Sequence, residues 1–138
     1  MTLSTPQPDL PWMLDDLVDV PNVVSVVVLS TDGLIVQKSS SMAQDLAEIL
    51  AAGASSMYSV AAGTGRRFAS GPVQQVVIEF QEHTLFIAAA GQNARLAVLC
   101  DQDVDMGMVA YEVSRLVTRI GDYLGTEART APDGSGHA

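Results

Sequence analysis

The side chains that most often perform chemistry are few in this sequence, and their spacing does not suit a catalytic or metal site. The two histidines, His83 and His137, stand far apart, and neither has a second histidine or a cysteine at metal-ligand spacing. No G-x-S-x-G segment presents a serine nucleophile, and nothing in the sequence places His83 beside one. We therefore expect no metal site, no cofactor and no enzymatic activity.

One glycine-rich segment, GTGRRF (63–68), invites comparison with a phosphate-binding loop. It follows a predicted helix and lacks the G-x-x-x-x-G-K-[ST] arrangement, so a helix end followed by a loop is the simpler interpretation. Arg66 and Arg67 in this segment are the only adjacent basic pair in the chain. They either lie in solvent or contact a carboxylate of a partner. We do not expect this protein to bind GTP itself.

Acidic residues dominate the charge of the chain. Asp101, Asp103 and Asp105 lie close together, but the twelve-residue calcium-loop pattern is missing, so we interpret them as acids at the start of the following helix. The formal net charge is -9, which repels nucleic acid and anionic lipid headgroups. No segment is apolar enough to insert into a membrane, and a single cysteine, Cys100, excludes an intrachain disulfide. These features favour a cytoplasmic protein.

Hydrophobic periodicity divides the chain into eight elements. Helical spacing of apolar residues marks three helices, and β-branched runs bounded by turn residues mark five strands. In chain order these are a helix at 10–18, strands at 23–29 and 34–38, a helix at 42–62, strands at 73–80, 84–91 and 95–100, and a helix at 106–124. We expect one domain over residues 9–124, with disordered tails at 1–8 and 125–138.

This order of elements predicts an α+β fold, a five-stranded antiparallel sheet with helices on both faces. The very apolar strands 23–29 and 95–100 should lie centrally, and strand 34–38, which ends in Lys38, should tolerate an edge. Strand 73–80 contains neither proline nor lysine, so at an edge it would invite pairing with another chain. A dimer through this edge would cover it.

The long helix at 42–62 has two contrasting faces. We expect Ala43, Leu46, Ala47, Leu50, Ala54, Met57, Tyr58 and Ala61 to form the face against the sheet. The outer face carries small side chains, two acids and no base, which is typical of an interface rather than of an ordinary solvent face. We predict that this face binds a partner through Asp45, Glu48, Ile49, Ala52, Ser55, Ser56 and Ser59.

The hairpin VVSVVVLSTDGLIVQKS, the strands QQVVIEF, TLFIAAAG and ARLAVLC, and the helix MGMVAYEVSRLVTRI together resemble the Roadblock/dynein light chain family over residues 10–124. The LSTDGL and RRF segments are similar to those of actinobacterial members encoded beside a sensor kinase and a Ras-like GTPase. The resemblance implies a dimer whose edge strands continue the sheet and whose paired middle helices bind the partner. The contacts expected between the two copies use Ala51, Tyr58, Val73, Gln75, Val77 and Glu79.

The function that this resemblance implies is that of a non-catalytic homodimeric adaptor. It would bind a small Ras-like GTPase and modulate its nucleotide cycle or its assembly with the sensor kinase. It would work in the cytoplasm, and recruitment to a membrane-associated complex stays open. The alternative is a small-molecule sensor module of the PAS or profilin-like type, which also places helices around an antiparallel sheet, and which would need a pocket with convergent polar groups.

Overall fold

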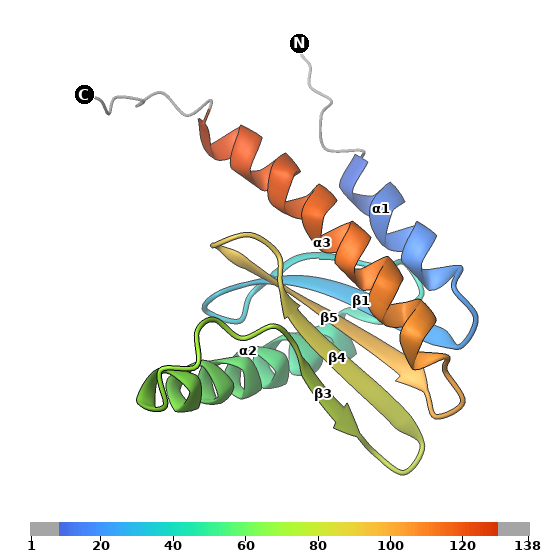
Figure 1. Ribbon diagram of the computed structural model, residues 1–138. Helices are drawn as coiled ribbons and strands as arrows, with labels where there is room; N and C mark the ends of the chain where they lie inside the picture. The colour runs from blue at the N-terminus through green and yellow to red at the C-terminus, as the bar shows by residue number, and fades with distance from the viewer. Residues whose placement is uncertain (1–8, 130–138) are drawn as a thin grey trace.

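The computed structural model describes the backbone from Asp9 to Arg129 and the side chains from Leu14 to Ile120. Figure 1 shows the elements, which follow the predicted order of helix, two strands, helix, three strands, helix. They are α1 (Asp9–Val18), β1 (Val23–Ser30), β2 (Ile35–Lys38), α2 (Gln44–Arg67), β3 (Val76–Glu79), β4 (His83–Ala89), β5 (Ala94–Asp101) and α3 (Met106–Arg129).

Several of the predicted boundaries fall elsewhere in the structure. The last helix, α3, continues past the predicted domain end at Leu124 as far as Arg129. Residues 1–8 and 130–138 lie outside the described residues, so the disorder predicted for them stays a prediction. Strand β3 is shorter than the predicted strand 73–80, because pairing with β4 begins only at Val76.

The five strands form one sheet in the order β2-β1-β5-β4-β3, and every neighbouring pair is antiparallel. The predicted α+β fold is therefore confirmed. The apolar strands β1 and β5 lie inside the sheet and β2 forms one edge, as the sequence predicts. The other edge is β3, whose position the sequence alone did not determine. Each edge strand carries unpaired backbone groups that can bind another chain.

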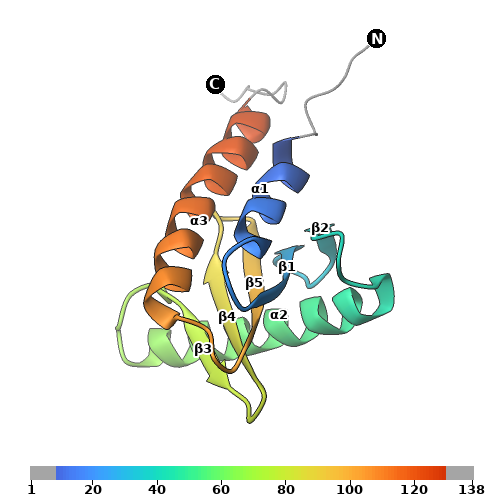
Figure 2. The ribbon, with the colours of Figure 1, turned by 90° about the vertical axis from the view of Figure 1, so that its right-hand side faces the viewer.

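Helices cover both faces of this sheet. Helices α1 and α3 pack on one face and α2 packs on the other (Figure 2). Strand β1 supplies both layers, because successive side chains of a strand point to opposite faces. Val26 and Val28 belong to the core beneath α1 and α3, whereas Val27 and Leu29 belong to the core beneath α2. Burial on both faces explains why this strand is apolar at nearly every position.

Helix α2 lies on the sheet through its smallest side chains. Its buried residues are Ala47, Ala51, Ala54 and Tyr58, at spacings of four, three and four residues. The alanines bring the helix backbone close to the strands, and this contact depends on their lacking longer side chains. The assignment of Leu46 to this face was wrong, because Leu46 precedes Ala47 by one residue, which is about 100° around a helix. Its side chain is 55% exposed.

The helix ends differ in how well the sequence predicts them. At the start of α3, the Asp105 carboxylate accepts a hydrogen bond from the Met108 N–H at 3.1 Å, so the capping interpretation of this acid is confirmed. Helix α2 runs to Arg67, beyond the predicted end at residue 62. Residues 63–67, predicted to belong to a helix end and loop, therefore continue α2, and Phe68 is its C-cap. Within the described residues, no helix is long and apolar enough to cross a membrane.

Candidate interaction surface

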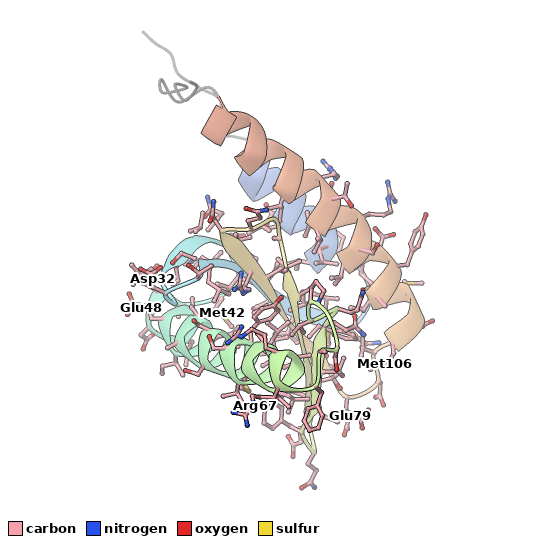
Figure 3. All side chains as sticks on the ribbon, turned by 60° about the vertical axis from the view of Figure 1, so that its left-hand side comes forward. Asp32, Met42, Glu48, Arg67, Glu79 and Met106 are labelled. Carbon is pink, nitrogen blue, oxygen red and sulfur yellow. The ribbon has the colours of Figure 1, made fainter. Side chains whose placement is uncertain are left out.

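The outward side of α2 presents most of the predicted partner-binding residues. Figure 3 shows Glu48 near the start of the helix and Arg67 at its end, and both side chains are exposed. Of the seven predicted residues, six are exposed: Asp45, Glu48, Ile49, Ala52, Ser56 and Ser59. The structure therefore brings these six residues together on one continuous surface of α2.

Ser55 is the exception among the predicted partner-binding residues. It is only partly exposed, and its hydroxyl donates a hydrogen bond to the Thr31 carbonyl at 3.2 Å. This bond ties the middle of α2 to the turn between β1 and β2, where Gly33 approaches Ser55 closely. Ser55 therefore packs mainly inside the protomer, and less of its side chain than predicted is accessible to a partner.

Two residues predicted at the dimer contact lie inside the protomer instead. Ala51 has no exposed surface, and Tyr58 is only 7% exposed. Both pack against the sheet, and the Arg95 guanidinium lies 4.2 Å from the centroid of the Tyr58 ring. This cation–π contact holds the aromatic side chain toward β5. The prediction for Ala51 and Tyr58 is corrected accordingly, because a side chain buried by its own sheet cannot cover a second chain.

An apolar stripe on α2 was missed by the sequence reasoning. Leu46, Ile49 and Val60 are large, apolar and 55%, 69% and 69% exposed, and Gly53 lies between them. At about 100° per residue these four positions fall within one narrow sector of the helix, beside the small and polar residues Ala52 and Ser59. The signal was present in the 46-49-53-60 spacing. It was hidden because Leu46 was assigned to the core and Val60 to neither face.

The two edges of the sheet are protected to different degrees. Strand β2 pairs with β1 irregularly between Val28 and Leu29, and its Lys38 N–H donates to the Gln37 side-chain oxygen at 3.1 Å. A bulge, a lysine and a side chain that satisfies the edge backbone all discourage pairing with another strand. Strand β3 pairs with β4 in an unbroken register from Val76 to Glu79 and has no bulge or lysine. The open edge is therefore that of β3.

The predicted dimer residues around β3 differ in their exposure. Gln75, Val77 and Glu79 are exposed, with Val77 at 37%, and they line the side of the sheet away from α2. Val73 lies before the strand and packs partly against the core beneath α2. Two phenylalanines that were not predicted flank this segment, Phe68 at the end of α2 and Phe80 directly after β3. They are 77% and 53% exposed, which is unusual for residues of this size.

The basic pair at the end of α2 does not form a phosphate site. Arg66 and Arg67 lie in the last turn, where their positive charges interact favourably with the partial negative charge of the helix C-terminus. Phosphate groups bind at helix N-termini, where backbone N–H groups point outward, so the opposite end of a helix disfavours them. Both arginines are exposed, and among the described residues neither forms an ion pair.

The remaining reactive groups are buried or isolated. Cys100 has no exposed surface, and burial, with a smaller effect of the nearby Asp101 charge, raises the pKa of its thiol to about 11. Such a thiol is almost fully protonated at neutral pH and is a poor nucleophile. Asp101, Asp103 and Asp105 do not gather around a common point, and no cluster of three or more potential metal ligands occurs in the described part of the chain.

Two open grooves lie away from the predicted partner-binding residues. One, of about 460 Å³, runs along β2 and includes Asp15, Val36 and Lys38. The other, of about 400 Å³, lies between α3, β4 and the segment just before β3, and is lined by alanine, valine, glutamine and hydroxyl side chains. Ligand pockets bury most of a small molecule and aim a few polar groups at it. These grooves are open to solvent, so neither resembles the pocket that the sensor alternative requires.

Comparison with known proteins identifies the fold and the family. The family model for the Roadblock/LC7 domain matches residues 11–100. A Roadblock/LC7 domain from Streptomyces avermitilis is 38% identical, with a TM-score of 0.79 over 83% of this chain and 96% of that one. Among curated proteins, no sequence matches this chain significantly.

More distant structures share the fold alone. Myxococcus xanthus MglB has a TM-score of 0.81 at 13% identity and covers 88% of this chain and 99% of its own. Acanthamoeba castellanii profilin IA has a TM-score of 0.56 at 16% identity, covering 81% and 96%. The family model covers well over half of the sequence, and the Streptomyces domain agrees with it in sequence and in structure. The chain therefore belongs to the Roadblock/LC7 domain family.

Proposed function

We propose that the protein is a non-catalytic homodimeric adaptor that binds a small Ras-like GTPase. In this proposal it modulates the nucleotide cycle of the GTPase or its assembly with a sensor kinase. The observation that carries the proposal is the surface of α2, which combines an apolar stripe with a small, polar and acidic stripe. Membership of the Roadblock/LC7 family, whose actinobacterial members this sequence resembles, supports the choice of partner.

The two stripes suit two different neighbours. Leu46, Ile49 and Val60 lie on the apolar stripe, and covering them would remove exposed hydrophobic surface from water. The polar stripe carries Glu48 and Ser59. Interfaces between proteins that also exist separately in solution are no more apolar than ordinary protein surface, so this stripe suits a partner of that kind. A second copy on the apolar stripe would leave the polar stripes of both copies free for a GTPase.

The open edge of β3 supports the homodimer independently of α2. Pairing two β3 strands antiparallel about Val77 would place Glu79 of each copy opposite the neutral Gln75 of the other. This register joins the two sheets without opposing like charges. The exposed rings of Phe68 and Phe80 flank the same segment, and the second copy would cover part of their surface.

The adaptor would act by choosing between conformations of its partner. A GTPase differs in shape between its GDP and GTP forms, so a protein that binds one form more tightly shifts the balance between them. No chemistry by the adaptor is needed for this effect. We place the protein in the cytoplasm, where it would reach a membrane only through the complex that contains its kinase.

The experiment that tests this function measures binding to the Ras-like GTPase encoded nearest to the protein, in its GDP form and with a GTP analogue. We expect binding that prefers one nucleotide form. Ser59→Arg places a large charged side chain on the polar stripe and should weaken binding at least tenfold. Ser114→Arg makes the same change at an exposed serine of α3, on the other face of the sheet, and should leave binding unchanged.

Two results would overturn the proposal. One is the absence of binding in both nucleotide forms, and the other is equal loss of binding in the Ser59 and Ser114 variants. Hits from a thermal-shift screen of small ligands, together with no GTPase binding, would instead revive the sensor alternative.

A further inference from the structure

We propose that the groove along the outer edge of β2 binds a short basic segment of another protein. Apolar contacts to Leu34 and Val36 and ion pairs to nearby carboxylates would hold this segment. The groove has a volume of about 460 Å³ and lies between α1 and the start of α2, where Asp15 and Gln44 line its two sides. Figure 2 shows β2 at the edge of the sheet near these two helices. The site goes beyond the proposed function, because it requires neither a GTPase nor a second copy.

The exposure of Val36 follows from an irregularity in β2. The register pairs Gln37 and Ile35 with consecutive residues of β1, which leaves Val36 between them unpaired. A bulge of this kind re-aims a side chain at the edge of a sheet. Ile35 packs against the core beneath α2, whereas Leu34 and Val36 on either side of it are 66% and 44% exposed. This edge therefore presents two large apolar side chains to solvent.

The same edge resists pairing with another strand, so its occupant must bind through side chains. The bulge interrupts the strand, and the Gln37 side-chain oxygen already accepts a hydrogen bond from the Lys38 N–H at 3.1 Å. The volume of about 460 Å³ falls within the range of small-ligand sites, about 300–1,000 Å³, and such a space holds only a few side chains. A short segment fits these limits better than a whole folded surface does.

The charges around the groove indicate a basic occupant. Asp19 follows Asp15 by four residues and donates its N–H to the Asp15 carbonyl at 3.2 Å, so both lie on one side of α1. Asp45 lies in the first turn of α2, on the other side of the groove. Lys38 is the one basic residue among the described residues that line the groove, and its ammonium group donates to the Met42 carbonyl at 2.8 Å. Within the part of the chain that the structure describes, none of these three carboxylates forms an ion pair.

A segment that combines lysine or arginine with apolar residues suits both features of the site. The long stems of these basic side chains can lie over Leu34 and Val36 while the charged ends reach the carboxylates. The eight residues that precede α1, MTLSTPQP, contain no lysine or arginine. A second copy carries a formal net charge of -9, which disfavours its approach to an acidic site. These charges favour a different protein as the source of the segment.

The test uses the full chain and a short capped peptide of alternating leucine and lysine. Matched peptides carry glutamine or glutamate in place of lysine. Fluorescence anisotropy of the labelled peptide gives the dissociation constant, and the amide NMR signals of the protein locate the site. We expect saturable binding of the lysine peptide that weakens as salt is raised, with the largest signal changes at β2 and Asp15. The glutamine peptide loses several exposed ion pairs and should bind about tenfold more weakly.

Two pairs of variants separate this site from general attraction to an acidic chain. Val36→Ser removes an apolar contact without changing charge, and Val77→Ser makes the same change at the other edge of the sheet. Asp15→Asn removes one charge beside the groove, and Asp16→Asn removes one charge from the side of α1 that faces α3. All four residues are exposed, so each variant should fold, which circular dichroism checks. Val36→Ser and Asp15→Asn should each raise the dissociation constant about threefold, with little change in the two controls.

Weakening by Val36→Ser and Asp15→Asn alone would support the basic-segment site. Absence of saturable binding, or equal binding of the glutamate peptide, would overturn it. Equal weakening by Asp15→Asn and Asp16→Asn would also overturn it, because it would indicate attraction to the whole acidic chain. Signals of β2 that shift when the protein is concentrated without peptide would assign the groove to a second copy instead. Binding of the GTPase is measured separately, so each of these results leaves the proposed function standing.

Discussion

At the scale of single residues, Gly33 shows how a side chain can be excluded for two separate reasons. Its φ is +87°, a conformation that costs other residues energy, and a Cβ there would lie 3.3 Å from the Cβ of Ser55. We expect Gly33→Ala to lower the free energy of unfolding by about 2 kcal/mol. Gly71→Ala is the matched control, since φ is +82° and nothing lies within 4 Å of the added Cβ.

Chemical denaturation of the two variants separates backbone strain from crowding. Gly71→Ala should lose only the backbone contribution, about 1 kcal/mol, and Gly33→Ala should lose more. Equal losses would show that Ser55 moves aside at no cost. In that case the contact between α2 and the turn after β1 would be looser than the structure indicates.

Cys100 makes a prediction about pH. Burial raises the pKa of its thiol from 9.0 to about 11, so the folded chain keeps this proton to a higher pH than the unfolded chain does. The stability that this provides is complete below pH 9 and is lost as the pH rises to about 11, by an amount on the order of 2 kcal/mol. Cys100→Ala should lack this decline. Unfolding free energies of the wild-type chain and of Cys100→Ala, measured from pH 7 to 11, test this prediction.

Individual residues also show the limit of sequence reasoning about the candidate surface. The exposure of Ile49, Ala52 and Ser59 followed from helical spacing alone. The exposure of Leu46 did not follow from spacing, because a leucine near the start of an amphipathic helix is usually buried. Which sector of the helix is buried depends on how the helix packs on the sheet. Ser55 was wrongly assigned to a free surface because its hydrogen bond to Thr31 joins segments that are far apart in the sequence. Helical spacing alone does not reveal such a contact.

At the scale of elements, the two edge strands have different roles that their sequences express. Val77 on β3 and Val36 on β2 are both edge valines with similar exposure, 37% and 44%. Val77→Lys should convert a dimer into a monomer at micromolar concentration, because an edge lysine opposes pairing with another strand. Val36→Lys, on the edge that is already bulged, should leave the dimer intact.

Sedimentation velocity on both lysine variants checks this prediction, with circular dichroism to confirm that each remains folded. If Val36→Lys alone dissociated the dimer, the second copy would bind along β2, and the assignment of the open edge would be wrong.

Most elements could be predicted because their patterns are local. Alternating or continuous apolar runs identified the five strands, and the largely apolar sequences of β1 and β5 placed them inside the sheet. Boundaries were less predictable where the decisive interaction is distant. The glycines at 63 and 65 suggested a helix end, yet α2 continues to Arg67, and β3 begins only where β4 offers a partner at Ile87.

At the scale of the whole molecule, charge should govern the encounter with a partner. A chain with a formal net charge of -9 is drawn to basic surfaces and repels other acidic ones. We expect association with a basic partner to slow several-fold between low and physiological salt, and dissociation to change less. Surface-bound kinetics at three salt concentrations measures both rates. A salt-independent association rate would show that apolar contacts alone guide the encounter.

The central claim is that a homodimer of this chain binds a Ras-like GTPase. The most direct test is light scattering coupled to size exclusion, on the protein alone and mixed with the GTPase in its GDP and GTP-analogue forms. We predict a mass of twice 14.5 kDa for the protein alone and a heavier complex with one nucleotide form. A single-chain mass in every sample, or a dimer that forms no complex with either nucleotide form, would contradict the account.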